Sequence, residues 1–551
     1  MFIRTTQRKN RDGTSVRYLQ LAHNVRDPET GIPQARIIHN FGREDQLDRE
    51  GLARLVNSIS RFLDPEVALA SQAPRDMRLM SSRAMGGTFL LDSLWKNLGI
   101  EKMLLELLLR RRYSMECERV IFALVANRAL GPCSKLSACD WAAREVMISG
   151  LSDIQVQHAY RAMDFLLEAE EEIQHEVFFS CASLLNLEVD LLFFDTTSTY
   201  FETEEEDTDG KGEKGFRVRG HSKDKRGDLP QVVIGFAVTR EGIPVRCWSW
   251  PGNTMDMTVI KQVKDDLRGW KLSRVITVVD RGFSSEDNLR YLQRGGGHYI
   301  AGEKMRSGKA EVEAALCRPG RFKKIKDNLE VKEITVGDGE KRVRYVLARN
   351  PQGAKRDRAD RDGIVSRLEA ELAHLPEIEG EAHSKAACAL LSHKAYGRYL
   401  TTDKCANPII DRRRIAEDAR LDGKFLIQTS DDTLSAEDVA LGYKQLYEVE
   451  DAFRSLKHTV DIRPVYHSKE ERIRSHVLLC WLALLLIRIS EVEVGDTWRN
   501  IEREISEMHL VEFIGGNGRI LQRTETTPAQ ESIFKALSLK GPPRFFAIEP
   551  E

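Results

Sequence analysis

Two aspartates follow apolar, strand-forming runs in this sequence, and each is a candidate ligand for a metal ion. Asp195 follows LLFF at 191–194, and Asp280 follows VITVV at 275–279. An aspartate in such a place can simply begin a turn at the protein surface. It can equally be a ligand that a rigid core strand holds in position. This pattern alone leaves both interpretations open.

A third carboxylate, Glu450, falls in the stretch 434–460, which has helical spacing and is predicted to form one long helix. Tyr443, Glu450 and Lys457 are spaced by seven residues, nearly two helical turns, so they would form one stripe, with Arg454 close to it. A surface helix would also align its charges. Apolar side chains in the same turns indicate instead a helix that is largely packed.

Three carboxylates that converge repel one another and raise each other's pKa unless cations neutralise them. Oxygen ligands without Cys or His partners favour Mg²⁺ or Mn²⁺. Two such ions, roughly 3.5–4 Å apart, stabilise the attacking and leaving oxygens of an in-line displacement at phosphorus. The expected chemistry is phosphodiester hydrolysis or strand transfer.

The elements that would position these carboxylates alternate in a recognisable order. Apolar runs bounded by turn residues predict strands, and apolar residues at helical spacing predict helices. The order from 187 onward is three strands, a helix, a strand ending in Asp280, a capped helix and a short strand. This order predicts a mixed sheet with helices packed on it.

The composition describes an ordinary globular chain of several domains. The chain has 551 residues, 41% hydrophobic and 30% charged, and a net charge of −2, so any DNA binding must use local basic patches. Nine single cysteines without a CxxC pair suit a reducing cytoplasm. The N-terminus lacks the apolar core of a signal peptide, and the apolar run at 477–489 is too short to span a membrane.

One local basic patch is the stretch 217–228, RVRGHSKDKRGD. It can be a solvated loop between two strands. It can also grip phosphates, because Lys223, Lys225 and Arg226 would neutralise backbone charge and release counterions. Arg281, directly after the second aspartate, is likewise placed to meet a phosphate.

Several separate motifs together resemble the bacterial insertion-sequence transposases of the DDE superfamily, in the branch with a Tyr-Arg-Glu-Lys signature. The resemblance covers roughly 187–490 in order, and it rests on FFDTTSTYFE, GHSKDKRGDLPQVVIGFAVTREGIPV, WPGNTMD, VVDRGF and YKQLYEVEDAFRSLKHTVDIRPVYH. One departure stands out, because Leu446 occupies the arginine position of the signature.

The resemblance implies a ribonuclease-H-like catalytic core in which Asp195, Asp280 and Glu450 bind Mg²⁺ or Mn²⁺, as two ions. It implies that the chain binds double-stranded DNA, both transposon ends and target DNA, as a homodimer on DNA. Residues expected to contact DNA are Tyr443, Lys457, Arg454, Arg281, Lys223, Lys225 and Arg226. A largely β insertion between the second aspartate and the glutamate fits 303–420.

The predicted fold class is α/β, a ribonuclease-H-like mixed sheet flanked by helices, with an inserted β-rich subdomain and a mainly helical N-terminal region. The expected parts begin with an N-terminal strand and helix segment at 1–80 and a helical DNA-binding region at 81–186. The catalytic core follows in two parts, at 187–302 and 421–492, on either side of the insertion at 303–420. A C-terminal tail covers 493–551.

The leading functional hypothesis is a cytoplasmic transposase that binds the terminal inverted repeats of its element, then cleaves DNA and transfers the strand. Two alternatives stay open. One is a ribonuclease-H-like nuclease that cuts without strand transfer, and the other is a catalytically silent DNA-binding regulator derived from a transposase.

Overall fold

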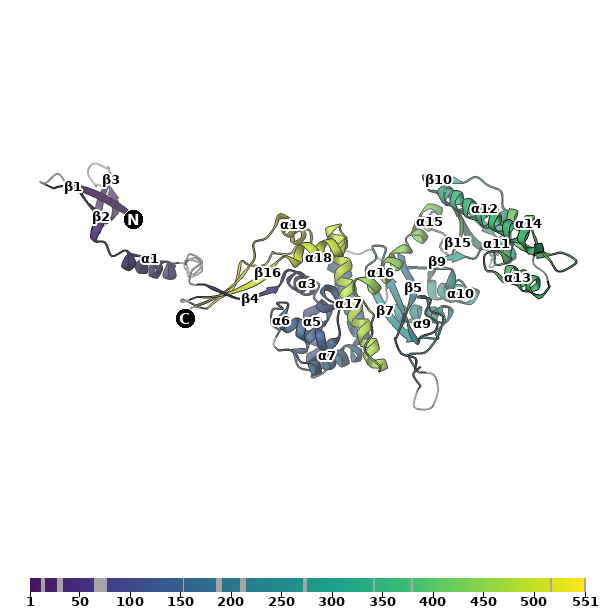
Figure 1. Ribbon diagram of the computed structural model, residues 1–551, viewed down its shortest axis with the longest axis horizontal. Coiled ribbons are helices and arrows are strands. Elements are labelled where there is room, and N and C mark those ends of the chain that lie inside the picture. The colour runs from purple at the N-terminus through teal and green to yellow at the C-terminus, as the bar shows by residue number, and fades with distance from the viewer. Residues whose placement is uncertain are drawn as a thin grey trace. The chain divides into compact units, whose positions relative to one another are not determined.

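The chain divides into two compact units in the computed structural model, whose helices and strands are labelled in Figure 1. The smaller unit comprises Met1–Ser82, Leu510–Glu525 and Pro543–Glu551, and the larger one comprises Arg83–His509 and Thr526–Pro542. The residues that the structure describes are 1–10, 15–26, 33–63, 77–151, 153–184, 191–208, 215–270, 275–339, 342–377, 380–515 and 518–549.

The described residues of the smaller unit form two sheets and a helix. The first sheet has the order β1-β2-β3, and the second has the order β18-β17-β16-β4. The predicted C-terminal tail therefore contributes three strands. The elements are β1 (Phe2–Lys9), β2 (Ser15–Arg26), β3 (Pro33–Arg43), η1 (Glu44–Gln46), α1 (Arg49–Leu63), β4 (Arg78–Ala84), β16 (His509–Gly515), β17 (Gly518–Arg523) and β18 (Phe545–Glu549).

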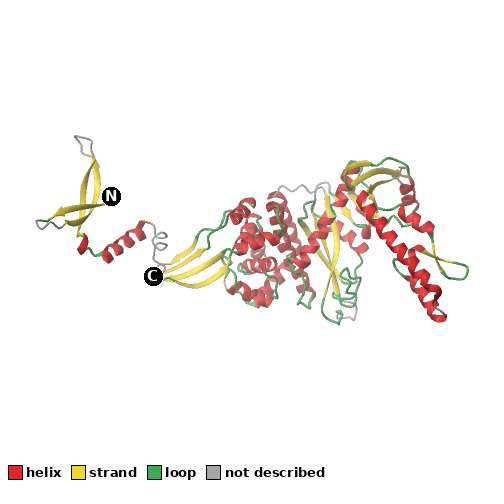
Figure 2. Ribbon diagram, turned by 45° about the horizontal axis from the view of Figure 1, so that its top comes forward, coloured by secondary structure: helices red, strands yellow, loops and turns green. Residues whose placement is uncertain are grey.

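The helical part of the larger unit is organised around α17 (Glu470–Val494), whose side chains from Ile473 to Ser490 are mostly buried. This helix contacts α5, α7 and strand β7, so it joins the helices to the sheet (Figure 2). No described helix is long and apolar enough to cross a membrane. The other helices here are α3 (Gly86–Asn97), α4 (Ile100–Arg110), α5 (Cys117–Leu130), α6 (Lys135–Arg144), α7 (Val156–Glu168), α8 (Glu170–Leu184), α18 (Trp498–Ser506) and α19 (Pro528–Ala536).

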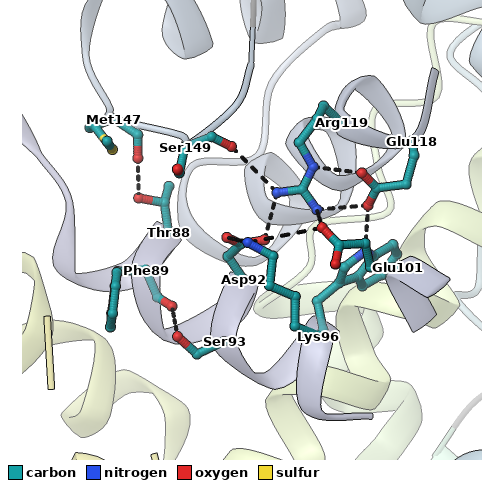
Figure 3. Close-up of polar contacts among 11 residues, drawn as sticks. Thr88, Phe89, Asp92, Ser93, Lys96, Glu101, Glu118, Arg119, Met147 and Ser149 are labelled. Atoms are coloured by element: carbon teal, nitrogen blue, oxygen red, sulfur yellow. Dashed lines mark hydrogen bonds and ion pairs between the residues drawn. The ribbon is translucent and has the colours of Figure 1, made fainter. Parts of the chain in front are cut away.

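A dense ion network ties α3, α4 and α5 together (Figure 3). The Arg119 guanidinium lies 2.6 Å from Asp92, 2.6 Å from Glu118 and 3.3 Å from Glu101. The Trp95 indole N–H also donates to Glu118, at 2.8 Å. Burial opposes the charged form of Arg119, but hydrogen bonds and attraction from the carboxylates outweigh it and raise its pKa. Lys96 also pairs with Asp92, at 2.7 Å, so two cations compensate three acidic side chains.

The sheet of the larger unit has nine strands in the order β10-β11-β12-β15-β9-β8-β5-β6-β7. Strands β5, β8 and β9 run parallel, and every other neighbouring pair is antiparallel. The predicted run of three strands, helix, strand, helix, strand is confirmed, although the predicted start of the first strand, at 187–190, lies outside the described residues. These elements are β5 (Leu191–Tyr200), β6 (Gln231–Val238), β7 (Pro244–Pro251), α9 (Asp256–Arg268), β8 (Ile276–Val279), η3 (Arg281–Phe283), α10 (Glu286–Gln293), η4 (Arg294–Gly296) and β9 (His298–Glu303).

Helices cover both faces of this sheet, because alternate side chains of its buried strands point to opposite sides. On one face Phe194, Trp248 and Phe178 pack with residues of α9 and α10 in a single apolar core. On the other face the ring of Phe453, from α16, stacks on Phe236 at 5.2 Å between centroids. Phe236 pairs with Asp195 across β5 and β6, so Asp195 lies on the α16 face.

The region 303–420, which the resemblance implied to be a largely β insertion, contains both strands and helices. Its strands β10, β11 and β12 extend the main sheet through β15, because a hairpin edge can pair with any free strand edge. Its longest element is a charged helix, α12, as the local sequence predicts. The elements are α11 (Ala310–Cys317), β10 (Lys323–Lys326), β11 (Leu329–Val336), β12 (Val343–Arg349), α12 (Pro351–His374), η6 (Leu375–Glu377), α13 (Gly380–Ser392), η7 (Gly397–Tyr399), β13 (Leu400–Thr402), β14 (Pro408–Ile410), α14 (Arg412–Ala419) and β15 (Lys424–Thr429).

The predicted long helix at 434–460 is wrong in one respect, because it is two helices. They are α15 (Ala436–Lys444), capped by Ser435 as predicted, and α16 (Tyr447–His458). Between them the backbone tightens, since the amides of Leu446 and Val449 donate to carbonyls three residues back. Tyr443 therefore does not share one continuous helical stripe with Glu450.

Candidate active site

Asp195 and Asp280 lie at adjacent positions on two parallel strands. Phe194 pairs with Val279 across β5 and β8, so the aspartates that follow them extend the same register. Asp195 does not end its strand, contrary to the sequence prediction, because β5 continues to Tyr200. It is β8 that ends beside it, at Val279, which removes the neighbouring strand on that side.

Lys223, in the basic loop 217–228, lies against Asp195. The Lys223 ammonium is 3.5 Å from Asp195 Oδ1 and 3.3 Å from Asp256 Oδ2. It also donates to the carbonyl and the hydroxyl oxygens of Thr196, at 2.6 and 2.7 Å. The Thr196 hydroxyl donates in turn to Asp256 at 2.5 Å. A cation is thus already accommodated beside Asp195, which shows that this position suits positive charge.

Burial raises the pKa of Asp195 to about 6. The negative charges of Asp256 and Asp280 add to this rise. Lys223 and the Thr196 N–H, which donates to Asp195 at 2.7 Å, oppose it. The raised pKa means that the ionised carboxylate lacks compensating charge, and this is the condition under which a divalent cation binds with most benefit.

Asp280 is held from a different direction. The Tyr443 hydroxyl, on α15, donates to Asp280 Oδ1 at 2.9 Å. Burial and the nearby negative charge of Asp280 raise the pKa of Tyr443, so the phenol keeps its proton and acts as a donor. Arg281 is 4.0 Å from the same carboxylate oxygen. Tyr443, which the sequence suggested as a DNA contact, therefore fixes one of the candidate ligands.

Gly302, on β9, makes this contact possible. A Cβ at this position would lie 2.1 Å from the Tyr443 hydroxyl oxygen and 2.9 Å from Arg281 Cγ. No side chain fits there without moving the tyrosine. Gly302 was not singled out from the sequence, because a glycine within a strand gives no sign of what it approaches.

Replacing Gly302 by alanine is expected to lower DNA cleavage about ten- to a hundredfold, the worth of a hydrogen bond to a charged group. Cleavage rates of Gly302→Ala, Tyr443→Phe and the double variant would test this. If the alanine acts by displacing Tyr443, the double variant cleaves no more slowly than the slower single variant. A double variant whose loss of rate equals the product of the two single losses would contradict this explanation. Gly363→Ala is the control, because its added Cβ meets nothing within 4 Å.

The third predicted ligand, Glu450, is not in contact with the two aspartates. Its side chain is exposed on α16, and within the described residues it has no hydrogen bond or ion pair. The described part of the chain also contains no cluster of three His, Cys, Asp or Glu side chains that could hold a metal. Phe453, one turn further along, packs on the sheet face that carries Asp195.

The remaining candidate DNA-binding residues are partly engaged within the protein. Lys457 forms an ion pair with Asp224 of the basic loop at 2.7 Å, and this pair ties the end of α16 to that loop. Arg454 pairs with Asp451 at 2.8 Å and is largely exposed. Arg226 pairs with Asp228 at 2.8 Å. Lys225 is exposed, with φ of 59°.

The basic loop also forms one wall of a cavity of about 450 Å³ beside Asp195. The cavity is also lined by the turn before α9, which includes Asn253, and by Asp256, the first residue of α9. Asp256 was not among the site residues expected from the sequence, and it shares the Lys223 ammonium with Asp195. The cavity is lined by Thr197, Ser198, Gly220, His221, Lys223, Val233, Asn253, Thr254, Met255 and Asp256.

Comparison with known proteins identifies two family domains. Residues 3–71 match the IS1634 family transposase, N-terminal domain, and residues 194–486 match the Transposase DDE domain. A solved structure, the cryo-EM structure of piggyBac transposase synaptic complex with hairpin DNA, is a distant likeness, with 11% identity and a TM-score of 0.36 over 76% of this chain and 79% of that chain. No curated protein matches the chain. Because the DDE domain spans more than half of the sequence and includes Asp195, Asp280 and Glu450, the chain belongs to the DDE transposases of insertion sequences.

Proposed function

We propose that this transposase binds the terminal inverted repeats of its element, and that Asp195, Asp280 and Glu450 are its catalytic carboxylates. The observation that carries the proposal is the adjacent placement of Asp195 and Asp280 on parallel strands. Two carboxylates in register, beside the end of β8, supply the oxygen ligands that Mg²⁺ or Mn²⁺ prefers.

The topology supports a ribonuclease-H-like core. Strands β7, β6 and β5 form an antiparallel meander, and β8 and β9 then add in parallel on the far side of β5. That order, with the first carboxylate on the central strand and the second on its parallel neighbour, is the arrangement expected of such a core.

Glu450 is proposed to complete the site when DNA and metal are bound. It lies on the helix that covers the Asp195 face, and its exposed carboxylate is not committed to a partner within the described residues. Three carboxylates repel one another unless cations neutralise them, so bound metal would favour the approach of Glu450 to the two aspartates.

DDE transposase domains generally use divalent metal ions. Ions bound at this site, proposed to be two, would stabilise the attacking and leaving oxygens at the scissile phosphate. The chain itself does the positioning. Tyr443 orients Asp280, Lys223 keeps positive charge beside Asp195, and Arg281, Lys225, Arg226 and Arg454 are available for phosphates of the DNA.

We also propose that the helices between 81 and 186 read the transposon end, with a helix in the major groove, and that the protein acts as a homodimer on DNA because two ends must be handled together.

The test is an assay with a plasmid that carries both ends of the element. With Mg²⁺ the purified protein should release the ends and join them to a target plasmid, and EDTA should stop both steps. End cleavage without joined product would favour the nuclease alternative. Specific end binding with no cleavage in Mg²⁺ or Mn²⁺ would favour the silent regulator and contradict the proposal.

A further inference from the structure

A second cavity, of about 720 Å³, lies in the region 305–424, and Asp195, Asp280 and Glu450 are not part of its lining. Six basic and three acidic side chains line it, an excess of three positive charges on a chain whose net charge is −2. Its lining residues are Met305, Arg306, Gly308, Glu313, Leu316, Cys317, Arg398, Tyr399, Arg413, Arg414, Glu417, Asp418, Arg420, Leu421 and Lys424.

Some of these charges are already satisfied. Arg306 forms an ion pair with Asp418, which also accepts a hydrogen bond from the Tyr399 hydroxyl. Arg413 pairs with Glu417 at 3.1 Å. Arg414 pairs with Asp411 at 3.3 Å and also donates to the Leu400 carbonyl at 2.7 Å. The acidic side chains are therefore largely used by other cations of the lining.

Three basic side chains of the cavity lining have no such carboxylate partner in the described part of the chain. Among the described residues, Arg398, Arg420 and Lys424 form no ion pair with a carboxylate. Arg398 lies over the Tyr399 ring at 4.6 Å, and Arg420 reaches only the Cys317 sulfur at 3.5 Å. Burial lowers the pKa of Lys424, and the neighbouring positive side chains, Arg420 among them, lower it further. An anion bound between these three groups would relieve their repulsion.

We propose that this cavity is a second binding site for the phosphodiester backbone of DNA, distinct from the catalytic carboxylates. The inference rests on the proposed function, because that function makes DNA the polyanion at hand. Arginine and lysine bind phosphate oxygens through charge-assisted hydrogen bonds. The one aromatic ring of the lining, Tyr399, has a face covered by Arg398, so the site suits a backbone phosphate better than a stacked base.

Salt dependence of DNA binding tests the site directly. Each phosphate contact contributes about 0.9 to the slope of log affinity against log salt concentration. The variant Arg398→Ala, Arg420→Ala, Lys424→Ala is expected to lower that slope by about 2 to 3 on a duplex of the transposon end. The matched control, Lys355→Ala, Arg358→Ala, Lys385→Ala, removes the same charge from exposed positions outside the cavity. Equal slopes for the two variants would overturn the proposal.

Alkylation of cysteines gives an independent readout on the unaltered sequence. Cys317 lines the cavity, whereas Cys388 is also exposed but lies outside it. Bound DNA is expected to lower the ratio of the Cys317 to the Cys388 alkylation rate several-fold. An unchanged ratio would overturn the proposal, and so would protection by millimolar inorganic phosphate without protection by DNA.

The proposed DNA site in the cavity and the proposed transposase function can be tested separately. If the wild-type protein cleaves and joins transposon ends but the cavity variant keeps the slope of the control, only the cavity proposal is wrong. If the wild-type protein does not cleave DNA with Mg²⁺ or Mn²⁺, the proposed function is wrong, whatever the salt slopes show.

Discussion

Replacing Asp195 by asparagine is expected to lower metal-dependent cleavage of transposon ends by more than about 100-fold and to leave DNA binding within about twofold. Mutation of a group that only orients a metal ligand lowers metal affinity or activity about 10- to 100-fold, so loss of a ligand itself is expected to lower activity more. Asparagine keeps the size of the side chain and one oxygen but removes the charge. The measurement is single-turnover cleavage with Mg²⁺, alongside binding in EDTA.

Asp287→Asn is the control for this experiment. Asp287 is an exposed carboxylate in the first turn of α10, with no ion pair in the described part of the chain, and its loss should leave cleavage unchanged. Cleavage by Asp195→Asn at a rate near that of wild type would refute the assignment of Asp195 as a catalytic ligand.

The second large effect concerns stability. Replacing Arg119 by methionine is expected to reduce the free energy of unfolding by about 3–5 kcal/mol, because the change leaves carboxylates buried without their partner. Asp92 and Glu118 are both buried, and only Lys96, 2.7 Å from Asp92, would remain nearby as a cation. Urea denaturation followed by circular dichroism would measure the loss.

Arg110→Met provides the comparison, because Arg110 is 66% exposed and lies 3.8 Å from Glu172. A surface pair of this kind is worth about 0–1 kcal/mol. Neutralising the stranded acids with Asp92→Asn and Glu118→Gln should restore part of the stability of the Arg119→Met protein. If Arg119→Met costs no more than Arg110→Met, the network is no stronger than a surface ion pair.

Much of the sheet could be predicted from the sequence, because its strands are rich in β-branched and aromatic residues and are separated by turn residues. The same reasoning should have carried β5 past Asp195, since the TTSTY that follows is itself strand-forming. The charge of Asp195 within an apolar run suggested a strand end at that residue, whereas β5 continues to Tyr200. What the local pattern cannot show is where a neighbouring strand stops, and it is the end of β8 that opens the site.

The break between α15 and α16 was beyond local reasoning for a different reason. Gly442 lies in the last turn of α15, but a single glycine within a helical pattern is tolerated and does not by itself predict a break. Leu446, the residue before α16, is buried at the break. The partners of Lys223 and Lys457 were equally hidden, because loops lack the periodicity that would predict which side chains they bring to a strand or helix.

The buried helix α17 has a consequence for where the enzyme would cut. It contacts both the N-terminal helices and the edge strand β7, and at about 1.5 Å per residue its 25 residues extend about 37 Å. Because this continuous helix contacts both parts, the helices proposed to read the transposon end and the sheet with the proposed catalytic carboxylates would keep a fixed separation. The number of base pairs between the recognised sequence and the severed bond would then be constant.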